Sequence, residues 1–295
     1  MMTKIMTTCF AGLRHTAAAI LLIALAALAV PDKALAQILT SPEFEALTTD
    51  SVLRDFSNQP YFGLYKDNYF IFGPSIGPKP TKENTNIKFQ ISIAQRLTRS
   101  TLPWGTYLYL FYTQKCFWNV LENSMPMTDL NFNPGIGLTK PLFVKNRYIG
   151  KMSLILEHES NGRDSIQSRS WNKVSLAANI MVSPNLMVHG KVWVPIVDGE
   201  NNRDLLYYTG LFQTGFQVMS NDRRFVGGVT VTKRKGWNFN MNTTVEFCWR
   251  ILKGDNQYFF VQYYNGYGEG LLAYKEFHSQ LRVGICIKPK LFSDY

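Results

Sequence analysis

The stretch Asn86-Ile-Lys-Phe-Gln-Ile-Ser-Ile-Ala94 alternates apolar and polar residues with a period of two. The stretch from Trp237 to Phe247, which reads Trp-Asn-Phe-Asn-Met-Asn-Thr-Thr-Val-Glu-Phe, repeats the pattern. Successive side chains of a β-strand point to opposite faces, so this period predicts strands with one apolar and one polar face.

Three features favour a transmembrane barrel over a soluble β-sandwich. The alternating segments are about ten residues long, which is the length that crosses a bilayer at a tilt. Their polar faces carry Lys, Asn, Gln and Glu, as the wall of a wet lumen does. Aromatic residues near the segment ends predict girdles at the two membrane interfaces: Tyr61, Phe62, Trp104, Tyr148, Trp171, Trp237, Tyr258 and Phe259. We therefore predict an all-β fold, an antiparallel transmembrane β-barrel, with the sandwich as the alternative.

Residues 1–36 have the pattern of a secretory signal peptide. Lys4 and Arg14 supply positive charge, and an apolar run of 14 residues extends from Ala17 to Val30. That run is short for a membrane span, and the small-x-small sequence ending at Ala36 predicts cleavage there. An uncleaved anchor is the alternative. We expect the domain to occupy residues 37–295.

The formal net charge of +10 is typical of a chain with an anionic partner, and a solvated basic surface with no partner is the alternative. A secreted chain rarely meets nucleic acid, so anionic lipid or lipopolysaccharide phosphate is the better partner class and no nucleic-acid partner is expected. Beyond the signal, Cys116, Cys248 and Cys286 form neither a disulfide framework nor a zinc pattern. We expect them to be small buried or lipid-facing groups.

The run Leu156-Glu-His-Glu-Ser-Asn-Gly-Arg163 places a base two residues before a hydroxyl. His158 and Ser160 share the strand face of Leu154 and Leu156, and the apolar face of a barrel is its outside. The pair is therefore predicted to face lipid near one rim. A site in that position suits an enzyme that takes its substrate from the bilayer.

Asn172 lies on the next predicted strand, on the apolar face of that strand. If it pairs with His158, residues 161–169 form the hairpin loop, and directly opposed residues share a face. His158 can then activate the Ser160 hydroxyl while Asn172 holds the imidazole. The Gly162 N–H or a metal ion is a candidate for oxyanion stabilisation. A His-x-Ser pair alone is more often structural, and the facing Asn is what strengthens the catalytic interpretation.

The chain resembles bacterial outer-membrane phospholipase A. The resemblance begins with the run 158–163 and with Ser168-Arg-Ser-Trp-Asn172. It extends to Lys88-Phe-Gln-Ile-Ser-Ile-Ala94, Tyr112-Thr-Gln-Lys115, Gly266-Tyr-Gly-Glu269 and Arg282-Val-Gly284, in the same order along the chain.

The resemblance implies a barrel of about 12 strands in the outer membrane. It also implies calcium-dependent removal of acyl chains from phospholipids, as phospholipase A1/A2 and lysophospholipase. Ser160 would be the nucleophile, His158 the base and Asn172 the orienting residue, with activation by homodimerisation.

The resemblance further implies a calcium site and a dimer contact. The main chain of Arg163 and the hydroxyl of Ser168 would bind Ca²⁺, and Ser124 looks like the ligand donated by the second subunit. The family commonly has an acidic residue where this chain has Ser165. Gln114 lies on a lipid-facing stripe, where a carboxamide needs a partner, and the family uses a glutamine there at the dimer contact. A position at the water-exposed rim is the alternative for Gln114.

Two non-enzymatic alternatives remain at this level. The polar lumen pattern also suits a porin or a structural outer-membrane barrel. A secreted β-sandwich that binds a ligand would show the same alternation without any membrane.

Overall fold

The computed structural model describes residues 61–98, 101–196, 201–236 and 238–289. The predicted signal peptide over residues 1–36 and the segment that follows it to residue 60 lie outside these residues. The description below therefore concerns the predicted barrel domain.

Strands make up most of the described chain. The only helical elements among these residues are short: η1 (Pro103–Gly105), η2 (Ser165–Gln167) and α5 (Leu206–Thr209). No helix in the described ranges has the length and apolar character needed to cross a membrane. The strands are β1 (Phe62–Leu64), β2 (Asn68–Pro74), β3 (Thr85–Arg96), β4 (Tyr107–Trp118), β5 (Met127–Val144), β6 (Arg147–Ser160), β7 (Ser170–Ser183), β8 (Leu186–Ile196), β9 (Phe212–Met219), β10 (Phe225–Lys233), β11 (Met241–Arg250), β12 (Gln257–Tyr267) and β13 (Phe277–Ile287).

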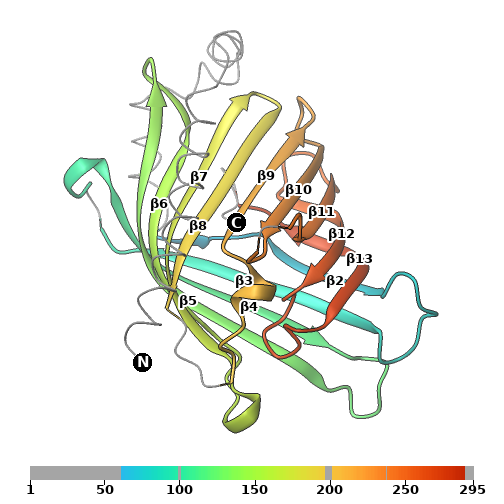
Figure 1. Cartoon of the computed structure of the whole chain (residues 1–295). Helices are drawn as coiled ribbons and strands as arrows, with labels where there is room; N and C mark the ends of the chain where they lie inside the picture. The colour runs from blue at the N-terminus through green and yellow to red at the C-terminus, as the bar shows by residue number, and fades with distance from the viewer. Residues whose placement is uncertain (1–60, 99–100, 197–200, 237, 290–295) are drawn as a thin grey trace, which may run out of the picture.

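The strands form one closed antiparallel sheet (Figure 1). Each of β3 to β13 pairs with its neighbours in sequence, and β13 returns to pair with β2. The short β1 pairs with the end of β3, beyond the part that pairs with β2. β1 and β2 together therefore take the place of a single strand in the barrel wall. The result is a 12-stranded barrel, as predicted, and the sandwich alternative is wrong because a single sheet closes on itself.

The side-chain alternation places apolar residues outside and polar residues inside, as predicted. On β6, Leu156 is 53% exposed whereas the next residue, Glu157, is 3% exposed. On β11, Phe247 is exposed and Asn242 is buried. Exposed apolar side chains around a closed barrel are typical of a wall that contacts lipid.

The predicted aromatic girdle is only partly correct. Trp104 and Phe259 are exposed, but Tyr148, Trp171 and Tyr258 are buried. These three alternate with outward-facing residues and therefore point into the barrel. They serve to fill the interior, which must be packed.

Most of the long connections lie at one end of the barrel and most of the short ones at the other. The connections 75–84, 119–126, 161–169 and 268–276, with residues 201–211 before β9, lie at one end, here called the loop end. The connections 145–146, 184–185, 220–224 and 251–256 lie at the other, here called the turn end. In outer-membrane barrels the short turns face the periplasm and the longer loops face outward.

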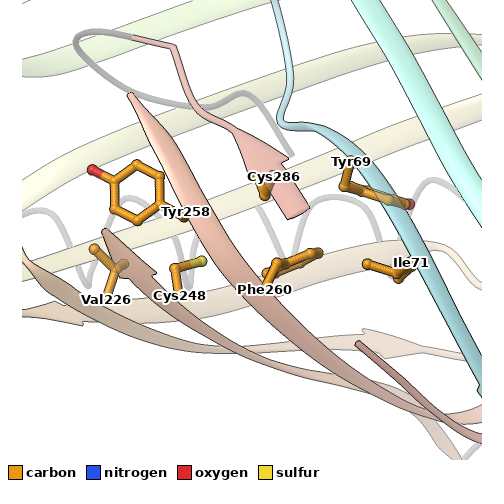
Figure 2. Packing of buried hydrophobic residues seen from close by; sticks show 7 residues of the cluster. All are labelled: Tyr69, Ile71, Val226, Cys248, Tyr258, Phe260 and Cys286. Atoms are coloured by element: carbon orange, nitrogen blue, oxygen red, sulfur yellow. The ribbon is translucent and has the colours of Figure 1, made fainter. Parts of the chain in front are cut away.

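An apolar cluster occupies the interior near the turn end. Its seven residues come from β2, β10, β11, β12 and β13, and Figure 2 shows them side by side. Cys248 and Cys286 belong to it, and both they and Cys116 are buried free thiols, as predicted. The cluster consists of Tyr69, Ile71, Val226, Cys248, Tyr258, Phe260 and Cys286.

Buried charges and an inward-folded loop fill the middle of the barrel. Glu269, in the connection between β12 and β13, accepts hydrogen bonds from Lys88 at 3.0 Å and from Arg282 at 2.7 Å. The N–H of Leu271 donates to Asn131 on the facing wall at 3.1 Å. A second apolar cluster, which includes Trp171, lies at the loop end, and a polar cavity of about 280 Å³ remains inside.

Replacing Glu269 with Ala is expected to lower the free energy of unfolding by about 3 kcal/mol or more, because two buried cations lose their shared partner. Glu83→Ala, an exposed site, is the matched control and should change stability little. Denaturant unfolding of the refolded protein in detergent measures both. Equal stability of the two variants would show that this network is not a major support of the barrel.

Candidate active site

The structure brings all the predicted site residues to one side of the barrel. They lie on β4, β6 and β7 and on the two loop-end connections that follow β4 and β6. These residues are Gln114, Ser124, His158, Ser160, Gly162, Arg163, Ser168 and Asn172.

His158 and Asn172 lie opposite each other in the β6–β7 register, as the hairpin arithmetic predicts. The ring Nδ1 of His158 lies 2.9 Å from the Oδ1 of Asn172. An amide oxygen only accepts, so Nδ1 carries the proton and Nε2 is left as the base. The Nδ2 of Asn133 donates to the carbonyl of His158 at 2.8 Å, which fixes the main chain on the other side.

Ser160 lies two positions further along β6, on the same outward face as His158. Both side chains are partly exposed, and their Cα atoms are about 6.6 Å apart on a strand. Among the described residues, the Ser160 hydroxyl does not donate to the His158 ring. Catalytic hydrogen bonds of this kind often form only when substrate binds.

Asn161 organises the loop that follows. Its Nδ2 donates to the carbonyl of Gln167 at 2.9 Å, and its Oδ1 accepts from the N–H of Arg169 at 3.0 Å. The same oxygen lies 3.4 Å from the N–H of Arg163. The sequence interpretation missed this role, although an Asn directly before a Gly at a loop start is a signal for such bonding.

Gly162 occupies a backbone conformation with φ of +64°. A methyl group added there would lie 2.8 Å from Cε2 of Phe132. Phe132 on β5 pairs in register with both Ser160 and Gln114, so the ring stands between them on the outer wall. Phe132 was also missed, because only the register places it beside the serine.

The proposed calcium ligands fall into two groups. Arg163 and Ser168 lie on the same loop, where the Arg163 guanidinium donates to Gln167 at 2.6 Å and to the carbonyl of Thr128 at 2.8 Å. Ser124 is exposed on the neighbouring β4–β5 connection, with φ of 65°. A main-chain carbonyl and a hydroxyl are hard oxygen donors, which suit Ca²⁺ and bind it weakly when few in number.

Gln114 finds hydrogen-bond partners on its own strand. The Tyr112 hydroxyl donates to its Oε1 at 3.0 Å, and its Nε2 donates to the Sγ of Cys116 at 3.4 Å. All three residues lie at alternate positions of β4, on its outward face. The carboxamide on the lipid-facing wall is therefore satisfied within this chain.

The carboxylates next to His158 face the interior. Glu157 pairs with Lys191 at 2.7 Å, and Glu159 pairs with Lys173 at 3.1 Å. The barrel wall separates these groups from the imidazole. Neither carboxylate is placed to orient His158, which leaves that role to Asn172.

The β8–β9 connection holds the site loop to the β12–β13 loop. Asn201 donates to the carbonyl of Ser165 at 2.7 Å, and Asn202 donates to that of Ser170 at 2.8 Å. Asp204 accepts from the Tyr274 hydroxyl and pairs with Lys275 at 2.8 Å. Partial burial opposes ionisation of Asp204, yet the hydrogen bonds from Lys275 and Tyr274 lower its pKa.

Comparison with known proteins gives a consistent result. A family model described as Phospholipase A1 matches residues 63–287. The Phospholipase A1 of Proteus vulgaris is 29% identical over 292 residues, which cover 88% of this chain and 94% of that protein. The Phospholipase A1 of Escherichia coli K12 is 28% identical over 257 residues, covering 80% of this chain and 83% of that protein.

Two solved structures are also similar. The outer membrane phospholipase A of Escherichia coli superposes with a TM-score of 0.67 and 25% identity, covering 78% of this chain and 99% of that one. The outer membrane phospholipase of Salmonella typhi, a dimer with bound calcium, has a TM-score of 0.68 and 23% identity. It covers 81% of this chain and 97% of that one, and it supports the fold.

Replacing Gly162 with Ala is expected to lower the rate of ester hydrolysis by about tenfold or more, because the methyl group meets Phe132 and strains a positive φ. The double variant Gly162→Ala/Phe132→Leu removes much of the contact but keeps the φ strain, so it should recover part of the rate. Gly63→Ala, which has open space around it, is the control. An unchanged rate in Gly162→Ala would contradict the importance of this loop geometry.

Proposed function

The chain belongs to the phospholipase A1 family, and on that premise we propose that Ser160, His158 and Asn172 are the catalytic triad of this outer-membrane phospholipase. The observation that carries the proposal is the His158–Asn172 hydrogen bond of 2.9 Å on the outward, apolar face of the barrel. Ser160 lies on that same face.

The mechanism follows from the placement of the three side chains. His158 Nε2 takes the proton from the Ser160 hydroxyl as Oγ attacks the carbonyl carbon of an acyl ester. The same nitrogen then delivers the proton to the departing glycerol oxygen, which leaves an acyl group on Ser160. Water attacks that acyl group by the reverse sequence and releases the fatty acid. Asn172 keeps Nδ1 protonated and the ring oriented throughout.

The lipid-facing position defines the substrate class. Leu154 and Leu156 continue the row of His158 and Ser160 along the outside of β6. A phospholipid in the bilayer can therefore bring its ester to Ser160 while its acyl chains stay on the apolar wall. We infer activity at both acyl positions and on lysophospholipids, as the resemblance to outer-membrane phospholipase A implies.

Calcium and the site loop are proposed to stabilise the oxyanion. The Arg163 carbonyl and the Ser168 hydroxyl would hold Ca²⁺ together with Ser124 of the partner subunit. Bound there, the ion would polarise the substrate carbonyl. The Gly162 N–H is a further donor on the same loop. The calcium-bound Salmonella relative supports calcium as the metal.

Homodimerisation is proposed to complete the site. Gln114, Phe132 and Ser160 are paired in register across β4, β5 and β6. A second copy that meets the Gln114 row would lie beside the nucleophile and could bring its Ser124 near. The dimeric Salmonella relative supports dimerisation. The porin alternative gains no support, because clusters and buried charges occupy the lumen.

Ser160→Ala is expected to lower calcium-dependent fatty-acid release by about 10⁴-fold or more, since the nucleophile is lost. Asn172→Ala should cost on the order of tenfold, the value of one orienting hydrogen bond. Titration of released fatty acid in mixed micelles measures both, and Ser175→Ala, an inward-facing serine on β7, is the control. Hydrolysis that persists in Ser160→Ala would refute the triad.

Crosslinking in detergent should show dimers that increase when Ca²⁺ and a substrate analogue are added. Gln114→Leu should weaken dimerisation. Chelation of Ca²⁺ should abolish hydrolysis while leaving the fold intact. Full activity in a strictly monomeric detergent complex would contradict the shared site.

A further inference from the structure

Three cations lie on two neighbouring connections at the turn end. Arg223 and Arg224 belong to the connection between β9 and β10, and Lys253 belongs to the connection between β11 and β12. The N–H of Arg250 donates to the carbonyl of Arg224 at 2.8 Å, so the two connections are neighbours. We call Arg223, Arg224 and Lys253 the rim patch. Within the described residues none of the three has an ion-pair partner.

Arg224 is held over the lipid-facing wall. Its guanidinium carbon lies 5.8 Å from the ring centre of Phe225 and 5.9 Å from that of Trp249. These rings are 45% and 44% exposed and are paired in register on the outer face. Contacts of this length are within the range of cation–π attraction. The cation is therefore fixed where the apolar wall meets the polar interface.

Two charged residues close to the rim patch, Asp222 and Arg250, form hydrogen bonds that stabilise the turn between β9 and β10. Asp222 Oδ1 accepts from the Ser220 hydroxyl at 2.6 Å and from the N–H of Arg224 at 3.0 Å. The Arg250 guanidinium donates to the Tyr258 hydroxyl at 3.0 Å and to the carbonyl of Asp222 at 3.3 Å. These bonds set the turn geometry. The Asp222 carboxylate also interacts electrostatically with Arg224, but the three cations of the rim patch outnumber the two carboxylates of these connections, Asp222 and Asp255.

We propose that the rim patch binds the phosphate of an anionic glycerophospholipid in the leaflet at the turn end. The planar guanidinium of Arg224 matches phosphate oxygens, and Lys253 adds a mobile point charge. The acyl chains would lie against exposed apolar side chains below the patch, among them Val218 and Phe247. The lipid is a structural ligand here, because the patch and Ser160 are at opposite ends of the barrel. The proposal is independent of the catalytic assignment.

The test uses the full mature chain carrying Ser160→Ala, so that bound phospholipid is not consumed. The protein in neutral detergent is titrated with phosphatidylglycerol or with phosphatidylcholine, and native mass spectrometry counts the lipid retained. The parent should retain phosphatidylglycerol in preference to phosphatidylcholine. Arg224→Gln and Lys253→Gln should each weaken retention about fivefold, the effect of one cation near an anionic surface.

The matched control is Lys79→Gln/Lys82→Gln, which removes two exposed cations at the loop end. It should retain phosphatidylglycerol as the parent does, and heat-modifiable gel migration shows that every variant is folded. Equal retention of the two lipids by the parent would overturn the proposal. Parent-like retention by Arg224→Gln/Lys253→Gln, or an equal loss in the control, would overturn it as well.

Discussion

Closure of the sheet is the constraint on which the rest of the structure depends. Lipid offers no hydrogen bonds, so a strand that crosses a bilayer must have every backbone group paired within the protein. The pairing of β13 with β2 completes that requirement. Once the sheet is closed, the strand face on which a side chain lies decides whether that side chain contacts lipid or the barrel interior. A slip of one residue on β6 would turn His158 and Ser160 inward, where no membrane lipid could reach them.

The two faces of the β6–β7 hairpin therefore have different roles. The inward residues Glu157, Glu159 and Lys173 of the hairpin, together with Lys191 on β8, balance one another's charges and fix the wall. The outward residues His158, Ser160 and Asn172 form the proposed catalytic site, beside the exposed side chains of Leu154 and Leu156. Loop contacts such as the one from Asn202 to Ser170 connect the packed interior to the exposed site. The family assignment supports a phospholipase of the outer membrane, and the proposed triad lies on the outer surface of its barrel.

The sequence predicts those features that depend on local periodicity. Alternation alone places Leu156 outside and Glu157 inside, and hairpin arithmetic alone places Asn172 opposite His158. Features that depend on contacts between distant strands were not predictable in this way. Phe132 is beside Ser160 only because of the β5 register, and Trp171 turned out to fill the interior although its position near a segment end suggested a girdle. The inward fold of the loop carrying Glu269 has no local signal, since its partners are on β3 and β13.

Ser160 is proposed to be an activated nucleophile on the lipid-facing surface. Covalent labelling with a long-chain alkyl sulfonyl fluoride, followed by peptide mass spectrometry, probes this role of Ser160. We predict modification at Ser160, strong preference for the long-chain reagent over a short polar one, and loss of labelling in His158→Ala. Labelling of other residues instead, or equal labelling of Ser160 by the short polar reagent, would contradict it.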